Sequence, residues 1–129
     1  EDLLNEAKDL LTAKYLSKTK AAFDKYIDLI GKESAEDFSM NTSFELMKNE
    51  RGAYRDAESY SKGTTELYAL AIRLALIDSL YEGESPFVIL DDPFAHFDDL
   101  RLSGALSVLS ALAKEKQIIY LTCAESRSV

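Results

Sequence analysis

Two adjacent carboxylates, Asp91 and Asp92, end a short apolar run in this chain. In phosphoryl-transfer sites, one acid at a strand end holds a hard Mg²⁺ ion and a second acid orients or deprotonates the attacking water. We expect Asp91 to be the metal residue and Asp92 the catalytic one. Two acids followed by Pro93 also describe an ordinary exit from a strand, because Asp and Pro favour turns. The apolar run before the acids and Asp98 after them favour the catalytic interpretation, a Walker B motif.

A second candidate site is formed by Ser61, Lys62 and Gly63, directly before a long apolar segment. A hydroxyl, bare backbone amides and the positive end of a helix can together face a phosphate. Glycine permits close approach of the backbone, and Lys62 could add charge, although an exposed lysine is more often only solvated. The competing interpretation is an ordinary helix start capped by Thr64 or Thr65.

The chain has no Gly-x-x-x-x-Gly-Lys-Ser/Thr segment, the Walker A loop whose backbone amides and lysine hold ATP phosphates. We therefore expect only half of a nucleotide site, with the Walker A loop in an N-terminal lobe that is absent here. The first residue, Glu1, is not Met, which also indicates a piece of a larger protein. On this interpretation the isolated chain does not hydrolyse ATP.

Composition limits the remaining possibilities. With 129 residues, 47% of them apolar, the chain can bury one sizeable core, and its length favours a single domain over residues 1–129. The net charge of −8 leaves no basic stripe for nucleic-acid phosphates, so we do not expect this chain alone to bind DNA tightly. One cysteine excludes an intrachain disulfide, and no apolar run reaches the roughly 20 residues that span a bilayer. The expected location is a reducing cytoplasm, away from membranes.

The segments around these motifs predict the elements that position them. Residues 1–31 form an amphipathic helix that ends at Gly31. Its apolar stripe consists of Leu4, Ala7, Leu11, Tyr15, Ala22, Tyr26 and Leu29. The stripe is interrupted at Lys18 and Thr19, so a plain surface helix competes with the root of a longer coiled coil, which we favour.

Residues 36–58 lose the helical period and alternate short apolar runs with turn-rich segments, which predicts a small antiparallel meander. The remaining segment, 59–129, carries the motifs. It begins with a helix over 65–81 that is apolar on nearly every side and is therefore expected to be buried between layers.

Two short apolar runs, 87–90 and 118–121, flank an amphipathic helix. This order makes a right-handed crossover between parallel strands, so the fold class is α/β. Parallel strands place Asp91, Asp92 and residues 122–124 at one carboxyl edge, where open α/β sheets bind ligands.

Three further side chains have simpler interpretations. His96 has no Cys or second His nearby, so we expect a structural role and not metal ligation. Asp98 is expected to cap the next helix while also lying in a loop at a dimer interface. Cys123 is expected to be a small buried hydrophobe at a strand end.

Taken together, these motifs resemble the C-terminal lobe of an ABC-type ATPase head of the SMC-like group, which includes SMC proteins, RecN, SbcC and the bacterial YhaN-like proteins. The similarity covers nearly everything from Tyr15 onward: the signature motif at 61–66, the helix after it, the Walker B motif, the D-loop through Asp98, and the strand at 117–122. The resemblance implies a P-loop NTPase fold that uses ATP and Mg²⁺.

In that family two heads enclose two ATP molecules, each held by the Walker A loop of one head and the signature of the other. The implied partners are the protein's own N-terminal Walker A lobe and a second head, while a coiled coil leaves the lobe. The resemblance implies that Ser61 and Gly63, with Lys62 between them, face the γ-phosphate bound to the opposite head. Relatives in DNA repair suggest that the full protein, not this acidic chain alone, contacts DNA.

The resemblance also assigns roles to the acids. Asp91 is implied to hold Mg²⁺ through water, Asp92 to activate the attacking water, and Asp98 to link the two sites across the interface. Arg101, just beyond the D-loop, is expected to form a salt bridge.

The chain departs from the family at two positions. Most ABC proteins carry Glu where this chain has the shorter Asp92, and Ala124 stands where the resemblance implies a switch histidine. A catalytically weak head that serves as a nucleotide-dependent dimerisation or scaffold module is therefore the alternative hypothesis. A transporter nucleotide-binding domain is a third option, disfavoured because a long helix and a meander precede the signature.

Overall fold

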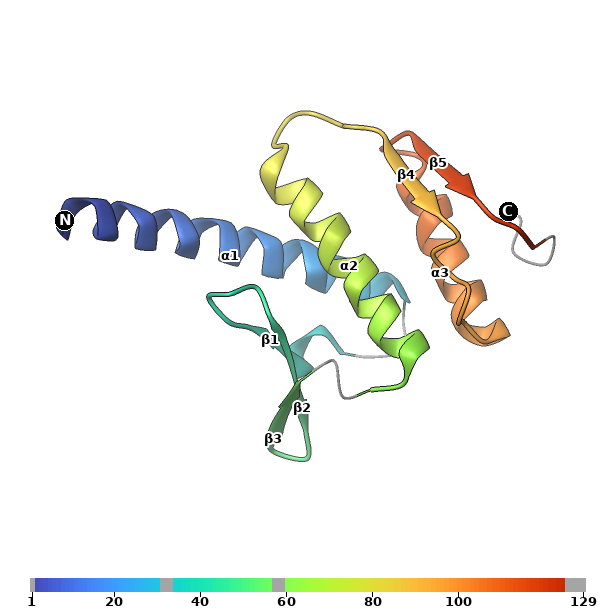
Figure 1. Cartoon of the computed structure of the whole chain (residues 1–129), viewed down its shortest axis with the longest axis horizontal. Helices are drawn as coiled ribbons and strands as arrows, with labels where there is room; N and C mark the ends of the chain where they lie inside the picture. Colours follow the sequence, from blue (N-terminus) through green and yellow to red (C-terminus); the bar gives the residue numbers. More distant parts are fainter. Residues whose placement is uncertain (1, 31–33, 57–59, 125–129) are drawn as a thin grey trace.

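The computed structural model describes residues 2–30, 34–56 and 60–124. Its elements are α1 Asp2–Ile30, the 3₁₀ helix η1 Ala35–Asp37, β1 Phe38–Met40, β2 Leu46–Glu50, β3 Ala53–Asp56, α2 Lys62–Leu80, β4 Val88–Asp91, α3 Asp99–Leu112 and β5 Ile118–Leu121. Figure 1 shows α2 crossing α1, with β1–β3 below α1 and the β4–α3–β5 unit to the right. The predicted α/β fold class is confirmed.

The two halves of α1 have different surroundings. The first half extends away from the other elements (Figure 1) and exposes the apolar side chains of Leu3, Leu4, Leu10 and Leu11. The second half buries Thr19, Phe23, Tyr26 and Ile27. An uncovered apolar stripe on a long helix is typical of a coiled-coil strand. None of the helices in the described ranges is long and apolar enough to span a membrane.

The predicted stripe of α1 is wrong at several positions, since it left out Phe23 and Ile27, which are buried. Leu29 is 45% exposed, whereas Thr19, placed in the interruption, is fully buried. Thr19 is accommodated because its hydroxyl lies 2.9 Å from Ser79 Oγ of α2, so both polar groups are satisfied inside the core. Gly31, the predicted end of the helix, lies outside the described residues.

A polar link joins α1, α2 and the segment before β5. The Tyr26 hydroxyl donates to Asp78 Oδ2, and Lys116 Nζ lies 2.6 Å from Asp78 Oδ1. Burial, followed by the hydrogen bond to Asp78, raises the pKa of Tyr26 well above its ordinary value, so the hydroxyl stays protonated as a donor. Together with the Thr19–Ser79 pair, this link fixes how α1 crosses α2.

The strands β1, β2 and β3 form the predicted antiparallel meander, in that spatial order. Residues 57 and 58 of the predicted span lie outside the described part. Arg51 and Gly52 have φ angles of 53° and 85°, the left-handed pair that a two-residue hairpin turn uses. The Phe38 ring packs edge-on against Phe23 at 5.4 Å between centroids, so the meander rests on the buried half of α1.

The strands β4 and β5 are parallel, as predicted, and pair from Val88 opposite Ile118 to Asp91 opposite Leu121. Side chains alternate along both strands. The outward-facing apolar residues are Phe87, Ile89, Ile119 and Leu121, which are between 40% and 61% exposed. Parallel sheets are normally covered on both faces, whereas the described residues cover only one face of this sheet.

Candidate functional site

The acid pair, Asp91 and Asp92, lies at the carboxyl edge of the small sheet. Asp91 is the last residue of β4, is exposed, and pairs in register with Leu121. The backbone amide of Asp92 donates to the Leu121 carbonyl at 2.8 Å, which continues the ladder for one more residue. The predicted convergence of the acid pair with the end of β5 is therefore present.

The Asp92 carboxylate is held by two side chains from the end of β5. Thr122 Oγ1 donates to Asp92 Oδ1 at 3.4 Å, and Cys123 Sγ donates to Oδ2 at 3.1 Å. Cys123 is exposed, so its predicted role as a buried hydrophobe is wrong. The strand alternation moves this thiol to the edge, where the carboxylate offers it a hydrogen-bond acceptor. The backbone of Asp92 has φ 40°, in the left-handed region.

The helix α2 starts without a side-chain cap. Ser61 occupies the cap position, yet its hydroxyl makes no capping bond and instead lies 2.9 Å from Thr64 Oγ1. The predicted caps, Thr64 and Thr65, are wrong because the helix begins earlier, at Lys62. The first turn carries no acidic residue. Within the part of the chain that the structure describes, the amides at this positive helix end therefore have neither a side-chain cap nor an acid in the first turn.

Gly63 lies where another segment of the backbone comes very close. A Cβ atom added at Gly63 would be 2.8 Å from the carbonyl oxygen of His96, closer than real Cβ contacts allow. The glycine is therefore required by the packing of the start of α2 against residues 93–98, the loop that follows the acid pair. We call residues 93–98 the bridging loop.

The His96 side chain completes this contact. Its Nε2 lies 2.9 Å from Lys62 Nζ, and its Nδ1 lies 2.8 Å from Glu66 Oε1. An ammonium group can only donate, so Nε2 accepts from Lys62 and Nδ1–H donates to Glu66. This cluster was not predicted from the sequence, because His96 lies 34 residues after Lys62 and only the fold brings its ring to the start of α2.

Asp98 ends the bridging loop and caps α3. Its Oδ1 accepts from the Arg101 amide at 2.8 Å, and its Oδ2 forms an ion pair with the Arg101 guanidinium. The predicted helix cap and salt bridge are both confirmed. Phe94 of the loop is fully buried and packs on Phe97 and Tyr120, with ring centroids 5.0 and 5.6 Å away. The loop is thus anchored at its centre as well as at its end.

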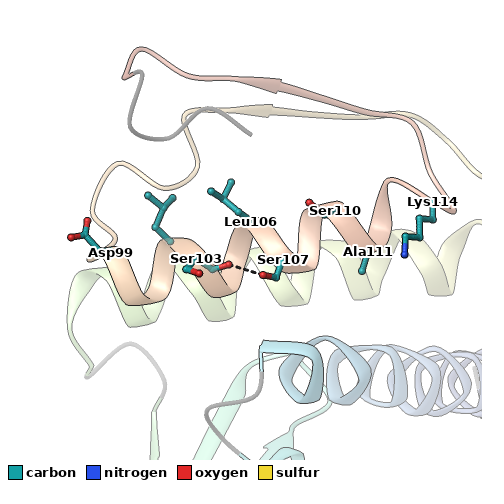
Figure 2. Close-up of a pocket in the computed structure, with 8 residues that line it drawn as sticks. Asp99, Ser103, Leu106, Ser107, Ser110, Ala111 and Lys114 are labelled. Atoms are coloured by element: carbon teal, nitrogen blue, oxygen red, sulfur yellow. Dashed lines mark hydrogen bonds between the residues drawn. The ribbon is translucent and has the colours of Figure 1, made fainter.

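A broad open groove of about 700 Å³ runs along α3. Figure 2 shows its lining, from Asp99 at one end of the helix to Lys114 at the other. The Ser107 hydroxyl in this groove donates to the Ser103 carbonyl at 2.9 Å, so it bonds within its own helix. None of the predicted site residues lines the groove, which is therefore separate from the acid pair and from the start of α2.

The acid pair has the ligand chemistry that Mg²⁺ prefers. Asp91 offers an exposed carboxylate, a hard oxygen ligand, at the strand end. Within residues 2–30, 34–56 and 60–124, no three His, Cys, Asp or Glu side chains gather into a metal cage. Mg²⁺ usually binds through one or two carboxylates together with waters and substrate phosphates, and Asp91 fits a site of that type.

No protein-family model matches the chain. Among curated proteins, it is 40% identical over 90 residues to the uncharacterized protein YhaN of Bacillus subtilis, an alignment covering 68% of the chain and 9% of that relative. It is also 32% identical over 117 residues to the DNA replication and repair protein RecF of Bacillus velezensis, covering 77% of the chain and 31% of that relative.

Among solved structures, the chain superposes with a TM-score of 0.70 on an SMC ATPase studied for ATP-driven dimerization and DNA-stimulated activation. That match covers 93% of the chain and 75% of the solved structure, at 20% identity. The chain is the C-terminal lobe of an SMC-like ABC ATPase head.

The SMC-like lobe also superposes on the Smc head domain of Pyrococcus furiosus, solved with an extended coiled coil and bound to the C-terminal domain of ScpA. The TM-score is 0.62 at 20% identity, covering 86% of the lobe and 29% of that structure. At this identity the structural matches show the fold. The SMC-like lobe spans less than a third of the length of either curated relative, 9% and 31%.

Proposed function

We propose that the SMC-like lobe supplies the signature and Walker B half of a composite ATPase head, which binds ATP and hydrolyses it with Mg²⁺ between two engaged heads. An N-terminal lobe of the same protein supplies the Walker A loop, and a second head completes each site. The observation that carries the proposal is the bridging loop, which leads from the acid pair to α3 and packs through His96 against the uncapped start of α2. Both halves of the expected chemistry therefore belong to one connected unit.

The acid pair serves the nucleotide bound to its own head. Asp91 would hold Mg²⁺, and the ion would neutralise charge that develops on the phosphate oxygens. Asp92 orients the attacking water and accepts its proton. Thr122 and Cys123 support this role because their hydrogen bonds fix the direction of the Asp92 carboxylate.

The start of α2 serves the nucleotide of the opposite head. Ser61 and Lys62 are exposed, and the buried Gly63 brings bare backbone close to the same point. A hydroxyl, an ammonium group and unneutralised helix amides favour a phosphate anion. Asp98, at the far end of the bridging loop, links the two sites across the head interface.

ATP contacts both heads only when they are engaged, so its binding shifts the population toward the engaged state and its hydrolysis releases it. The exposed half of α1 continues as one strand of a coiled coil. We place the complete protein in the cytoplasm and in a DNA-associated process, in line with the name of its relative RecF.

The test uses the complete protein, with its Walker A lobe, and the Asp92→Asn variant. Asparagine keeps the size of the side chain and tolerates a positive φ, so only the basic oxygen is lost. We expect steady-state hydrolysis to fall by about 10²- to 10⁴-fold, while ATP-dependent association of heads persists. Unchanged hydrolysis would reject the role of Asp92, and a wild-type protein that neither hydrolyses ATP nor associates with it would reject the whole proposal.

A second candidate function follows from Ala124. Where the family resemblance implies a switch histidine, this residue offers only a methyl group, and Thr122 Oγ1 bonds with its backbone instead. A lobe of this kind can drive nucleotide-dependent dimerisation with little turnover. ATP-dependent association of the wild-type protein without measurable hydrolysis would favour this scaffold role over the ATPase.

A further inference from the structure

We propose that His96 is a positioning residue that holds Lys62 in place at the start of α2 and thereby ties the signature to the loop that follows the acid pair. This inference rests on the proposed function, because it concerns the signature that one head offers to the nucleotide of another. Lys62, Glu66 and His96 are called the imidazole cluster below.

The first support is that both ring nitrogens are engaged, on opposite sides, by residues of α2. Lys62 donates to Nε2 at 2.9 Å, while Glu66 accepts from Nδ1–H at 2.8 Å. Glu66 therefore fixes the tautomer in which Nε2 carries a lone pair. The other Glu66 oxygen, Oε2, is buried without a hydrogen-bond partner among the described residues. A buried carboxylate oxygen without a hydrogen-bond partner is unfavourable. The hydrogen bond between Glu66 Oε1 and the His96 ring offsets this cost.

The second support is that the imidazole is an uncharged partner for the ammonium group of Lys62. A carboxylate in the position of the imidazole would hold Lys62 but also cancel its charge. A neutral imidazole accepts the hydrogen bond without adding a negative charge beside Lys62, and it holds the Glu66 carboxylate on its other nitrogen, so the ammonium group stays beside the amides of α2, where an anion would meet it. Lys62 is exposed, and a lysine without an acceptor keeps its rotamer freedom in water, which binding of an anion would have to remove.

The third support is that the backbone of His96 touches the same turn. The His96 carbonyl oxygen would be only 2.8 Å from a Cβ atom added at Gly63. His96 thus fixes two consecutive residues of the signature, Lys62 through the ring and Gly63 through the backbone. If the bridging loop moves beside the acid pair at one nucleotide site, Lys62 and Gly63, which face the other nucleotide site, consequently move with it.

The experiment measures ATP-dependent association of heads in the complete protein, together with nucleotide binding by single heads as a separate readout. His96→Phe keeps a ring and removes both polar contacts, whereas His96→Gln keeps one acceptor and one donor. We expect His96→Phe to raise the ATP concentration for half-maximal association about tenfold, the effect of one hydrogen bond to a charged group. His96→Gln should remain within about threefold of wild type on the same scale, and single-head binding should not change.

Lys62→Met should be at least as weak as His96→Phe, because it removes the charge of Lys62 as well as the contact, and the double variant should be no worse than Lys62→Met alone. Lys18→Met is the matched control, since it removes another lysine ion pair, with Glu82, away from the site; it should leave association unchanged. Three results would overturn this inference alone. The first is that His96→Phe or Lys62→Met associates as well as wild type, and the second is that His96→Gln is as weak as His96→Phe. The third is that the losses multiply in the double variant. A wild-type protein that does not associate with ATP would overturn the proposed function as well.

Discussion

The helices α2 and α3 both begin beside the bridging loop, yet their first turns are built in opposite ways. At α3, Asp98 caps the helix through its side chain and Asp99 adds a second acid. At α2, the Ser61 hydroxyl does not cap, no acid lies in the first turn, and the first helical residue is Lys62. One helix start has a side-chain cap and an acid in its first turn, whereas the other has neither.

The difference shows that capping is not needed to keep α2 folded. The helix buries Leu67, Tyr68, Ala71 and Leu74, among others, so tertiary packing stabilises it from the first turn onward. Packing of an apolar face generally contributes more than local propensity does. The stability of α2 therefore does not depend on a cap at its start, and variants at the two helix starts should behave differently.

The largest effect is expected when Gly63 is replaced by alanine, in comparison with the same substitution at Gly104. Gly63→Ala places a methyl group 2.8 Å from the His96 carbonyl, so the bridging loop must move. We expect unfolding to become easier by about 1–3 kcal/mol and ATP-dependent head association to fall by roughly 100-fold, because the cluster and the backbone approach are lost together. Chemical unfolding and an association assay measure the two effects.

Gly104 in α3 is the matched control. A Cβ there meets its nearest atoms at 3.8 and 3.9 Å, an ordinary contact. Gly104→Ala should therefore stabilise the protein by up to about 1 kcal/mol through helix propensity. Equal behaviour of the two alanine variants would contradict the close approach at Gly63.

The next effect concerns charge at the start of α2. Ser61→Asp supplies a better cap and should raise the unfolding free energy by about 0.5–1 kcal/mol. The same charge should weaken ATP-dependent association by roughly tenfold or more, because it repels phosphate where a positive helix end stood. Ser61→Asn, a cap without charge, separates the two effects; an Asp variant that associates as well as the Asn variant would show that no anion binds there.

A smaller effect is expected at α3. Asp98→Ala removes a capping bond of 2.8 Å to the Arg101 amide, which should cost about 1 kcal/mol of unfolding free energy. The accompanying ion pair is largely exposed and should add little. Asp98→Asn keeps the cap and should recover most of the loss in urea unfolding; no recovery would show that the ion pair, and not the cap, is the stabilising contact.

The smallest effect is expected for Ser61→Ala. Because the Ser61 hydroxyl makes no capping bond, its removal should change the unfolding free energy by only a few tenths of a kcal/mol, well below an ordinary cap loss. Chemical unfolding of this variant beside Asp98→Ala compares the two helix starts directly. A loss at Ser61 as large as that at Asp98 would mean that α2 is capped in solution.

Periodicity and local chemistry predicted most of the fold. Apolar spacing located the three long helices, two short apolar runs located β4 and β5, and an Asp before a helix identified the Asp98 cap. These signals act over a few residues and survive in the folded chain. Buried Thr19 escaped prediction because its hydroxyl is satisfied by Ser79 of another helix, a partner that no local pattern reveals.

The candidate site was predictable only in part, for the same reason. The acid pair and its neighbours at 122–124 follow from strand direction, which sequence order fixes. The imidazole cluster and the Cys123–Asp92 contact depend on how separate segments pack. The start of α2 was misplaced because Thr64 and Thr65 are plausible local caps, whereas packing against the bridging loop begins the helix at Lys62.

The left-handed backbone of Asp92 bears on which acid this position can accept. At φ 40°, short polar residues such as Asp and Asn are tolerated far better than longer side chains. The glutamate that most ABC proteins carry at the equivalent place would have to adopt a disfavoured conformation on this turn, or reshape it. The shorter acid therefore suits the backbone conformation at this position. Folding should tolerate Asp92→Asn better than Asp92→Glu.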